Sequence, residues 1–251
     1  MRTKVNKITK WNQIEWKPIE NKIFRMQQKI FQASRLNERN KMFKLQKSLI
    51  QSYWAKLLAI RQITQDNKGK NTAGVDGIKS IGPELRMELV NEICLDGKAS
   101  PIRRTYISKP ENPNELRPLG IPTIKDRIKQ KLALLALEPQ WEALFDPNTY
   151  AFRKGRNQHD AIESAYKSIN RLPKYVLDAD IEKFFDRIFH DKLLEKVNTF
   201  PAMKMQIKSW LKAGILNTDP FLEATGHEST RGTPQGSVIS PLLANIALNG
   251  I

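Results

Sequence analysis

The chain has 251 residues and is 40% hydrophobic, so it is long enough to bury one large core or two smaller ones. A net charge of +16 with an ordinary aromatic content of 8% excludes a disordered basic tail. It favours nucleic acid as the partner, over a ribosomal-type protein or a binder of anionic membranes. Cys94 is the single cysteine, which excludes an internal disulfide and a cysteine-based metal cluster, and no apolar run approaches the ~20 residues that cross a bilayer.

Residues 17–65 are predicted to be helical, because apolar side chains recur at spacings of three and four. Ile19 and Ile23 belong to one such series, and Leu49 and Leu57 belong to another. The faces between them carry Lys22, Arg25, Lys29, Arg35, Arg39, Lys41, Lys44 and Lys47. A solvated basic face and an RNA-binding helical extension both fit this pattern, and the overall charge favours RNA.

The next predicted elements are two helices on either side of a hairpin. Residues 66–77 are rich in turn formers and indicate a loop or a boundary. Helical periodicity returns over residues 83–96 and again over 124–143. Between these helices, residues 103–108 and 116–121 read as strands joined by a proline-containing turn.

The second half of the chain is expected to alternate short helices with loops. Its predicted elements are a basic loop at 150–156, a helix at 158–170, a strand at 175–180, a helical turn at 183–187, helices at 190–198 and 203–213, a hairpin at 221–231, and a helix at 239–248. Helices interspersed with short strands predict a mixed α+β protein.

The predicted strand at 175–180 carries two carboxylates. Side chains alternate along a strand, so Asp178 and Asp180 point to the same face. Two carboxylates at one strand end form a hard-oxygen site that suits magnesium better than zinc. The structural alternative is that Asp180 only caps the helical turn that follows it.

A Gly/Pro loop, Gly232-Thr233-Pro234-Gln235-Gly236, precedes the apolar helix predicted at 239–248. The amide groups of a helix N-terminus favour phosphate, and glycines permit a close approach of the backbone. The side chain of Gln235 can both donate and accept hydrogen bonds toward a bound nucleotide. An ordinary loop-to-helix turn is the alternative.

Two cations flank the turn of the 103–121 hairpin. Lys109 and Arg117 would lie near each other across it, as a point charge and a bidentate fork that suit a triphosphate. Unremarkable surface cations are the alternative.

In chain order, the 175–186 segment and the 232–245 segment resemble the palm of group II intron reverse transcriptase/maturases. Thr72-Ala73-Gly74-Val75-Asp76-Gly77 also matches that family. Family members have a catalytic aspartate followed, five positions later, by an aromatic residue beneath the nucleotide sugar. The resemblance therefore implies that Asp180 and the backbone of Ile181 bind metal, that Phe185 excludes a 2′-hydroxyl, and that Asp178 is structural.

The resemblance assigns further residues to binding. The nucleotide-binding residues it implies are Lys109, Arg117, Phe185, Gln235 and Gly236. The template or RNA-binding residues that we expect are Arg153, Arg156, Lys22, Arg25 and Lys29.

The fold that the resemblance implies is a right-hand polymerase, here fingers and a partial palm with a basic N-terminal helical extension. The expected boundaries are 1–66 for the extension, 67–172 for the fingers and 173–251 for the partial palm. The family polymerises with two Mg²⁺ ions ~3.5–4 Å apart, whose ligands include a Tyr-Ala-Asp-Asp turn. No Asp-Asp pair occurs in the 251 residues, so we expect a front half that is inactive alone.

The implied function is an RNA-directed DNA polymerase and intron maturase, present as a fragment. The expected partners are group II intron RNA, template-primer with dNTP, and a C-terminal half carrying the missing palm, thumb and maturase domain, with no membrane. The alternatives are a non-catalytic RNA-binding splicing cofactor and a decayed or split reading frame. The preference for Lys over Arg indicates an AT-rich genome, hence a bacterial cytoplasmic or plastid protein that is not secreted.

Overall fold

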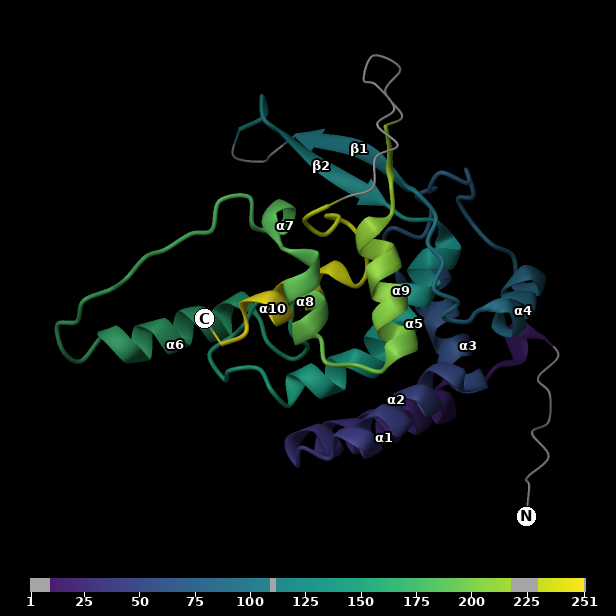
Figure 1. Cartoon of the computed structure of the whole chain (residues 1–251), viewed down its shortest axis with the longest axis horizontal. Coiled ribbons are helices and arrows are strands. Elements are labelled where there is room, and N and C mark those ends of the chain that lie inside the picture. Colours follow the sequence, from purple (N-terminus) through teal and green to yellow (C-terminus); the bar gives the residue numbers. More distant parts are fainter. Residues whose placement is uncertain (1–9, 109–111, 218–229, 251) are drawn as a thin grey trace.

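The computed structural model of the chain describes residues 10–108, 112–217 and 230–250. Helices dominate it, and a small sheet lies at one end of the molecule (Figure 1). This mixture confirms the α+β class. Within the described ranges, no helix is long and apolar enough to cross a membrane.

Residues 17–65 are helical, as predicted, but they are divided into α1 (Trp16–Arg35), α2 (Arg39–Gln51) and α3 (Tyr53–Arg61), with a π-helical turn at Gln62–Asp66. α1 and α2 lie side by side at the base of the molecule in Figure 1. Each has one apolar face that is buried and one basic face that is exposed.

The central element is α5 (Ile124–Glu142), which is buried along most of its length. α1, α2 and α3 pack against it, and α10 (Ser240–Leu248) contacts it from another side. The side chain of Thr123 begins the helix by accepting a hydrogen bond from the backbone N–H of Asp126. A broad apolar face, which the sequence predicts, explains why so many elements meet on this helix.

Buried glutamines join the N-terminal helices to the rest of the core. The Gln46 amide donates to Oε1 of Gln140 at 2.6 Å, and the Gln140 amide donates to the carbonyl of Asn198 at 3.0 Å. Ser34 donates to the Gln140 carbonyl at 2.9 Å. Because each buried polar group has a partner, this network costs little and fixes α2 against α5. One continuous apolar core extends from Trp11 to Ile246.

The sheet has three strands in the order β2-β1-β3. The predicted hairpin is confirmed: β1 (Ile102–Ser108) and β2 (Leu116–Ile121) are antiparallel, with Ile107 opposite Arg117. β3 (Ile215–Asn217) pairs in parallel with β1 and was not predicted. A three-residue strand is too short to show an alternating pattern in the sequence.

The remaining helices are α4 (Pro83–Glu92), α6 (Gln158–Ile169), α7 (Phe184–Arg187), α8 (His190–Lys196) and α9 (Pro201–Lys212). All five fall where helices or helical turns were predicted. α8 contacts both α9 and α10. The hairpin predicted at 221–231 falls largely on residues 218–229, outside the described residues.

The predicted buried strand at 175–180 is wrong for this structure. The segment forms no strand, and its side chains are exposed, with Val176 73% and Leu177 91% accessible. The reason is that no described segment pairs with it, so no backbone ladder buries its apolar residues. Figure 1 shows the chain from α6 to α7 arching away from the body of the molecule.

Candidate functional site

The 232–237 loop is held against the short helix α7. The backbone N–H of Thr233 donates to the Phe185 carbonyl at 2.7 Å, and that of Gly232 donates to the Ile188 carbonyl at 2.8 Å. Gly232 has φ +84°, and a Cβ there would lie 2.8 Å from the Phe185 carbonyl oxygen. Only glycine fits this approach. The structure thus brings Phe185 and the Gly/Pro loop together.

The other side of the same loop rests on the β1–β2 hairpin. The backbone N–H of Gly120 donates to the Gln235 carbonyl at 2.6 Å. Gly236 has φ +102°, and its missing Cβ would meet the Gly120 carbonyl oxygen at 2.8 Å. The loop is therefore wedged between hairpin and α7, with the Gln235 side chain half-buried and Gly236 exposed.

Two buried polar side chains brace the loop, and sequence reasoning missed both. Oε1 of Gln130, on α5, accepts from the Ser237 hydroxyl and from the Val238 N–H, each at 2.9 Å. Nε2 of His190 lies 2.7 Å from the Gly232 carbonyl. Nothing in the sequence marks Gln130, because the helix that carries it also holds many other polar residues. His190 gives no signal in the sequence either, because nothing around it distinguishes it from an ordinary helix residue.

An aromatic edge contact links the 150–156 loop to this site. The rings of Phe152 and Phe185 are 6.3 Å apart at an interplanar angle of 84°. Phe152 adopts a left-handed φ of +56° and is 63% exposed. Nearby, the Arg156 guanidinium lies 5.4 Å from the Tyr150 ring centre. An exposed aromatic ring beside a cation is the combination that can stack on a nucleic-acid base.

Arg153 is placed differently from the expectation that it contacts the template. It is buried, and it forms a bidentate pair with the Glu142 carboxylate at 2.6 and 3.1 Å. It also donates to the carbonyls of Asp146 and Thr149 at 2.7 Å each. Because its guanidinium is saturated inside the protein, Arg153 holds the loop in shape and is not free to bind RNA.

Asp178 and Asp180 are both exposed, on the arching segment before α7. α7 begins after Lys183 without a side-chain cap, so Asp180 does not cap it. The Asp180 carboxylate is free to act as one oxygen ligand of a hard cation. Across the described ranges, however, no three His, Cys, Asp or Glu side chains are grouped to hold a metal. One ligand fits, and the others would have to come from elsewhere.

The Thr72–Gly77 loop is anchored by a buried arginine on α5. Arg127 donates to the carbonyls of Gly69 at 3.0 Å and Thr72 at 2.6 Å. Burial lowers the pKa of Arg127, and the nearby Asp76 carboxylate opposes that shift. A Cβ on Gly74 would lie 2.8 Å from the backbone of Thr123, so the loop touches the start of α5. Sequence reasoning identified the loop but missed Arg127.

The other predicted binding residues that the structure describes lie on exposed faces. Arg117 is exposed on β2, while Lys109 lies outside the described residues. Lys22, Arg25 and Lys29 are exposed on α1. Their roles in binding stay predictions.

Two family models match the chain. "N-terminal domain of reverse transcriptase" matches residues 11–93, and "Reverse transcriptase (RNA-dependent DNA polymerase)" matches residues 107–251. The second match covers more than half of the chain. The Gly/Pro loop, Phe185 and β2 fall within it, together with the last two residues of β1.

Relatives include "Protein YkfC" of Escherichia coli, 33% identical over 240 residues, which are 90% of this chain and 61% of that protein. "Group II intron-encoded protein LtrA" of Lactococcus lactis is 34% identical over 73% of this chain and 30% of its own length. "Maturase-like protein 1" of Euglena gracilis is 29% identical over 94% of this chain and 50% of its own. The chain therefore spans less than two thirds of each.

Among solved structures, the "Partial Cas6-RT-Cas1--Cas2 complex" matches with a TM-score of 0.46 and 23% identity, over 79% of this chain and 33% of that one. A TM-score below 0.5 at this identity does not establish a shared function.

Proposed function

The chain belongs to the reverse transcriptase family, among the group II intron reverse transcriptases and maturases, and we propose that it supplies the fingers and part of the palm of an RNA-directed DNA polymerase. Residues 1–66 would be the basic extension, 67–172 the fingers and 173–251 the partial palm. The observation that carries the proposal is the 232–237 loop, wedged between Phe185 and the β1–β2 hairpin.

We place the incoming nucleotide at this loop. Gln235 and Gly236 would contact it, since glycine leaves the backbone accessible there. Phe185 would lie beneath the sugar, and Lys109 and Arg117 on the hairpin would bind the phosphates. The support is that hairpin, loop and Phe185 are joined by direct hydrogen bonds.

We further propose that the Asp180 carboxylate and the Ile181 carbonyl hold divalent metal, two Mg²⁺ ions serving the complete enzyme. Such ions would supply positive charge to the reacting oxygens of primer and nucleotide. What this chain contributes is one exposed carboxylate, five residues before Phe185 in the sequence.

We propose that the rest of the palm packs on the exposed apolar surface around α6. The amphipathic helix α6 buries none of its residues, and Ile162 and Tyr166 on it are 65% and 63% exposed. Val176 and Leu177 on the segment that follows α6 are also exposed. Contiguous exposed apolar side chains mark an interaction site, and a segment that pairs with no described strand can accept one. Both features support a C-terminal half as partner.

We propose that the basic N-terminal helices and the 150–156 loop bind group II intron RNA and the template-primer. Lys22, Arg25, Lys29 and Arg156 are the cations concerned. Arg153 is omitted because its guanidinium is engaged internally. The bacterial cytoplasm or a plastid stays a prediction for the compartment.

RNA affinity should fall steeply with salt, because phosphate contacts release counterions. For six or more contacts we expect a loss of at least about a hundredfold between roughly 50 and 200 mM salt. Fluorescence anisotropy of a labelled RNA with the purified chain measures this. An affinity that hardly changes over that range would refute the assignment of the basic helices to RNA.

A non-catalytic RNA-binding splicing cofactor is the second candidate. It is favoured by the lack of a grouped set of metal ligands within residues 10–108, 112–217 and 230–250. The two functions separate in a primer-extension assay on the completed protein, because only the polymerase would extend.

A further inference from the structure

Two phenylalanine rings contact the ring of Phe185. The ring centres of Phe184 and Phe185 are 5.8 Å apart at an interplanar angle of 65°. The Phe152 ring, from the 150–156 loop, lies 6.3 Å from that of Phe185 at 84°. Phe184 packs against the apolar core, whereas Phe152 is 63% exposed. Phe185 therefore has one aromatic neighbour that the core fixes and one that lies at the surface.

The orientation of the Phe185 ring depends on these contacts, because its own helix restrains it little. α7 has only four residues and no side-chain cap, and so short a helix is unstable by itself. The hydrogen bond from Thr233 fixes the backbone of Phe185, but it does not act on the side-chain torsions. The ring is only half-buried. What touches it therefore decides where it points.

The 150–156 loop holds Phe152 in a costly conformation. Its φ of +56° is left-handed, which is unfavourable for a bulky residue. Both neighbours in the chain are fixed: the buried Asn245 amide on α10 donates to the Ala151 carbonyl at 2.8 Å, and Arg153 is bound to Glu142 and to two backbone carbonyls. Strain of this kind persists only where the surroundings enforce it, and it is commonest at functional sites.

We propose that Phe152 is a positioning residue for sugar selection: its ring keeps the Phe185 ring in place beneath the nucleotide sugar. The inference rests on the proposed function, in which Phe185 excludes a 2′-hydroxyl. Steric exclusion requires a ring that cannot turn aside, because a mobile ring would move away from the added oxygen at little cost. Phe152 supplies that restraint from a loop that is itself anchored at both neighbouring residues.

The test measures kcat/KM for incorporation of a dNTP and of the matching rNTP by the chain completed with a polypeptide that carries the Asp-Asp pair. Phe152→Leu removes the ring but, like phenylalanine, is unbranched at Cβ, so the cost of the positive φ is unchanged. It should lower the ratio of dNTP to rNTP incorporation by about two- to tenfold, the range that the energy of one aromatic contact allows. Most of the change should be faster use of the rNTP. Phe152→Tyr keeps the ring, and its hydroxyl can reach water at this exposed position, so it should retain the wild-type ratio.

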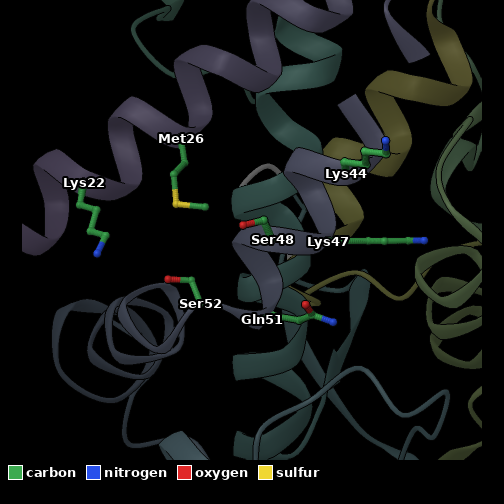
Figure 2. Close-up of a pocket in the computed structure, with 7 residues that line it drawn as sticks. All are labelled: Lys22, Met26, Lys44, Lys47, Ser48, Gln51 and Ser52. Atoms are coloured by element: carbon green, nitrogen blue, oxygen red, sulfur yellow. The ribbon is translucent and has the colours of Figure 1, made fainter. Parts of the chain in front are cut away.

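Three further variants separate this effect from others. Phe24→Leu removes a phenylalanine that is 59% exposed on α1, and it should leave the ratio unchanged. Lys22→Gln, in the cleft between α1 and α2 that Figure 2 shows, should weaken RNA binding without changing the ratio. Phe185→Val should lower the ratio by at least about tenfold. Adding Phe152→Leu to Phe185→Val should have no further effect, because Phe152 acts through Phe185.

A lower fraction of folded protein slows both nucleotides equally and leaves the ratio unaffected. Thermal melting of the purified chain checks folding, and Phe152→Ala replaces Phe152→Leu if melting is lowered. An unchanged ratio in the Phe152 variant, with a lowered ratio in Phe185→Val, would overturn the role of Phe152 alone. Equal losses for dNTP and rNTP in the Phe152 variant would also overturn it and would assign the ring to stacking on a base.

Failure of the proposed function gives different results. An unchanged ratio in Phe185→Val would remove the sugar gate, and the role of Phe152 with it. No primer extension by the completed wild-type protein would refute the polymerase itself.

Discussion

Asp180→Asn is expected to abolish DNA synthesis in a polymerase completed by a polypeptide that carries the Asp-Asp pair. Asparagine keeps the shape of the side chain but removes the negative charge that a cation requires. Loss of a metal ligand removes several kcal/mol of transition-state stabilisation, so we expect a fall of about a thousandfold or more. Primer extension on an RNA template measures it.

Asp178→Asn is the matched control, because both carboxylates are exposed on the same segment. It should retain far more activity, and RNA binding by both variants should stay close to that of the wild type. Full activity in Asp180→Asn together with loss in Asp178→Asn would transfer the metal role to Asp178.

Gly236→Ala is expected to lower the free energy of unfolding by about 2–4 kcal/mol. The substitution meets two obstacles: φ is +102°, and the new Cβ would lie 2.8 Å from the Gly120 carbonyl oxygen. Relief would require the loop to move off the hairpin, which would break the hydrogen bond from Gly120 to Gln235. Urea denaturation of the purified chain measures the change.

Gly77→Ala is the control that measures the cost of a positive φ alone, without a steric clash. Gly77 also has a positive φ, +71°, but nothing lies within 4 Å of the added Cβ. It should cost only about 1 kcal/mol. Equal destabilisation by the two substitutions would show that the loop is not tightly seated on the hairpin.

Local patterns in the sequence predicted most helices and the hairpin. The three-and-four spacing over residues 17–65 reflects the buried face of α1, α2 and α3, and the alternation at 103–108 reflects a real strand pair. These patterns succeed because each element buries one side of itself, whatever lies opposite.

The strand prediction at 175–180 failed because a strand depends on a partner elsewhere in the chain, which a local pattern does not show. Apolar residues alternating with aspartates predict a strand, but a strand also needs a neighbour, and no described segment supplies one. The pairing of β3 with β1 was missed because it joins residues that are distant in the chain.

The candidate site was predicted in part. The Gly/Pro loop and Phe185 were identified as separate motifs, and the structure brings them into hydrogen-bonded contact. The braces Gln130 and Arg127 could not be found, because each acts on a segment far away in sequence. Arg153 looked like an exposed cation, yet Glu142 turns it inward. Sequence gives the charge of a side chain but not what lies beside it.

Primer extension by the purified 251-residue chain, with and without a polypeptide that carries the Asp-Asp pair, tests the central claim most directly. We expect the chain alone to bind the RNA template but to give no more primer extension than a protein-free blank. When the second polypeptide is added, we expect magnesium-dependent DNA synthesis. Processive synthesis by the chain alone would contradict the account that it supplies only one of the metal-binding carboxylates.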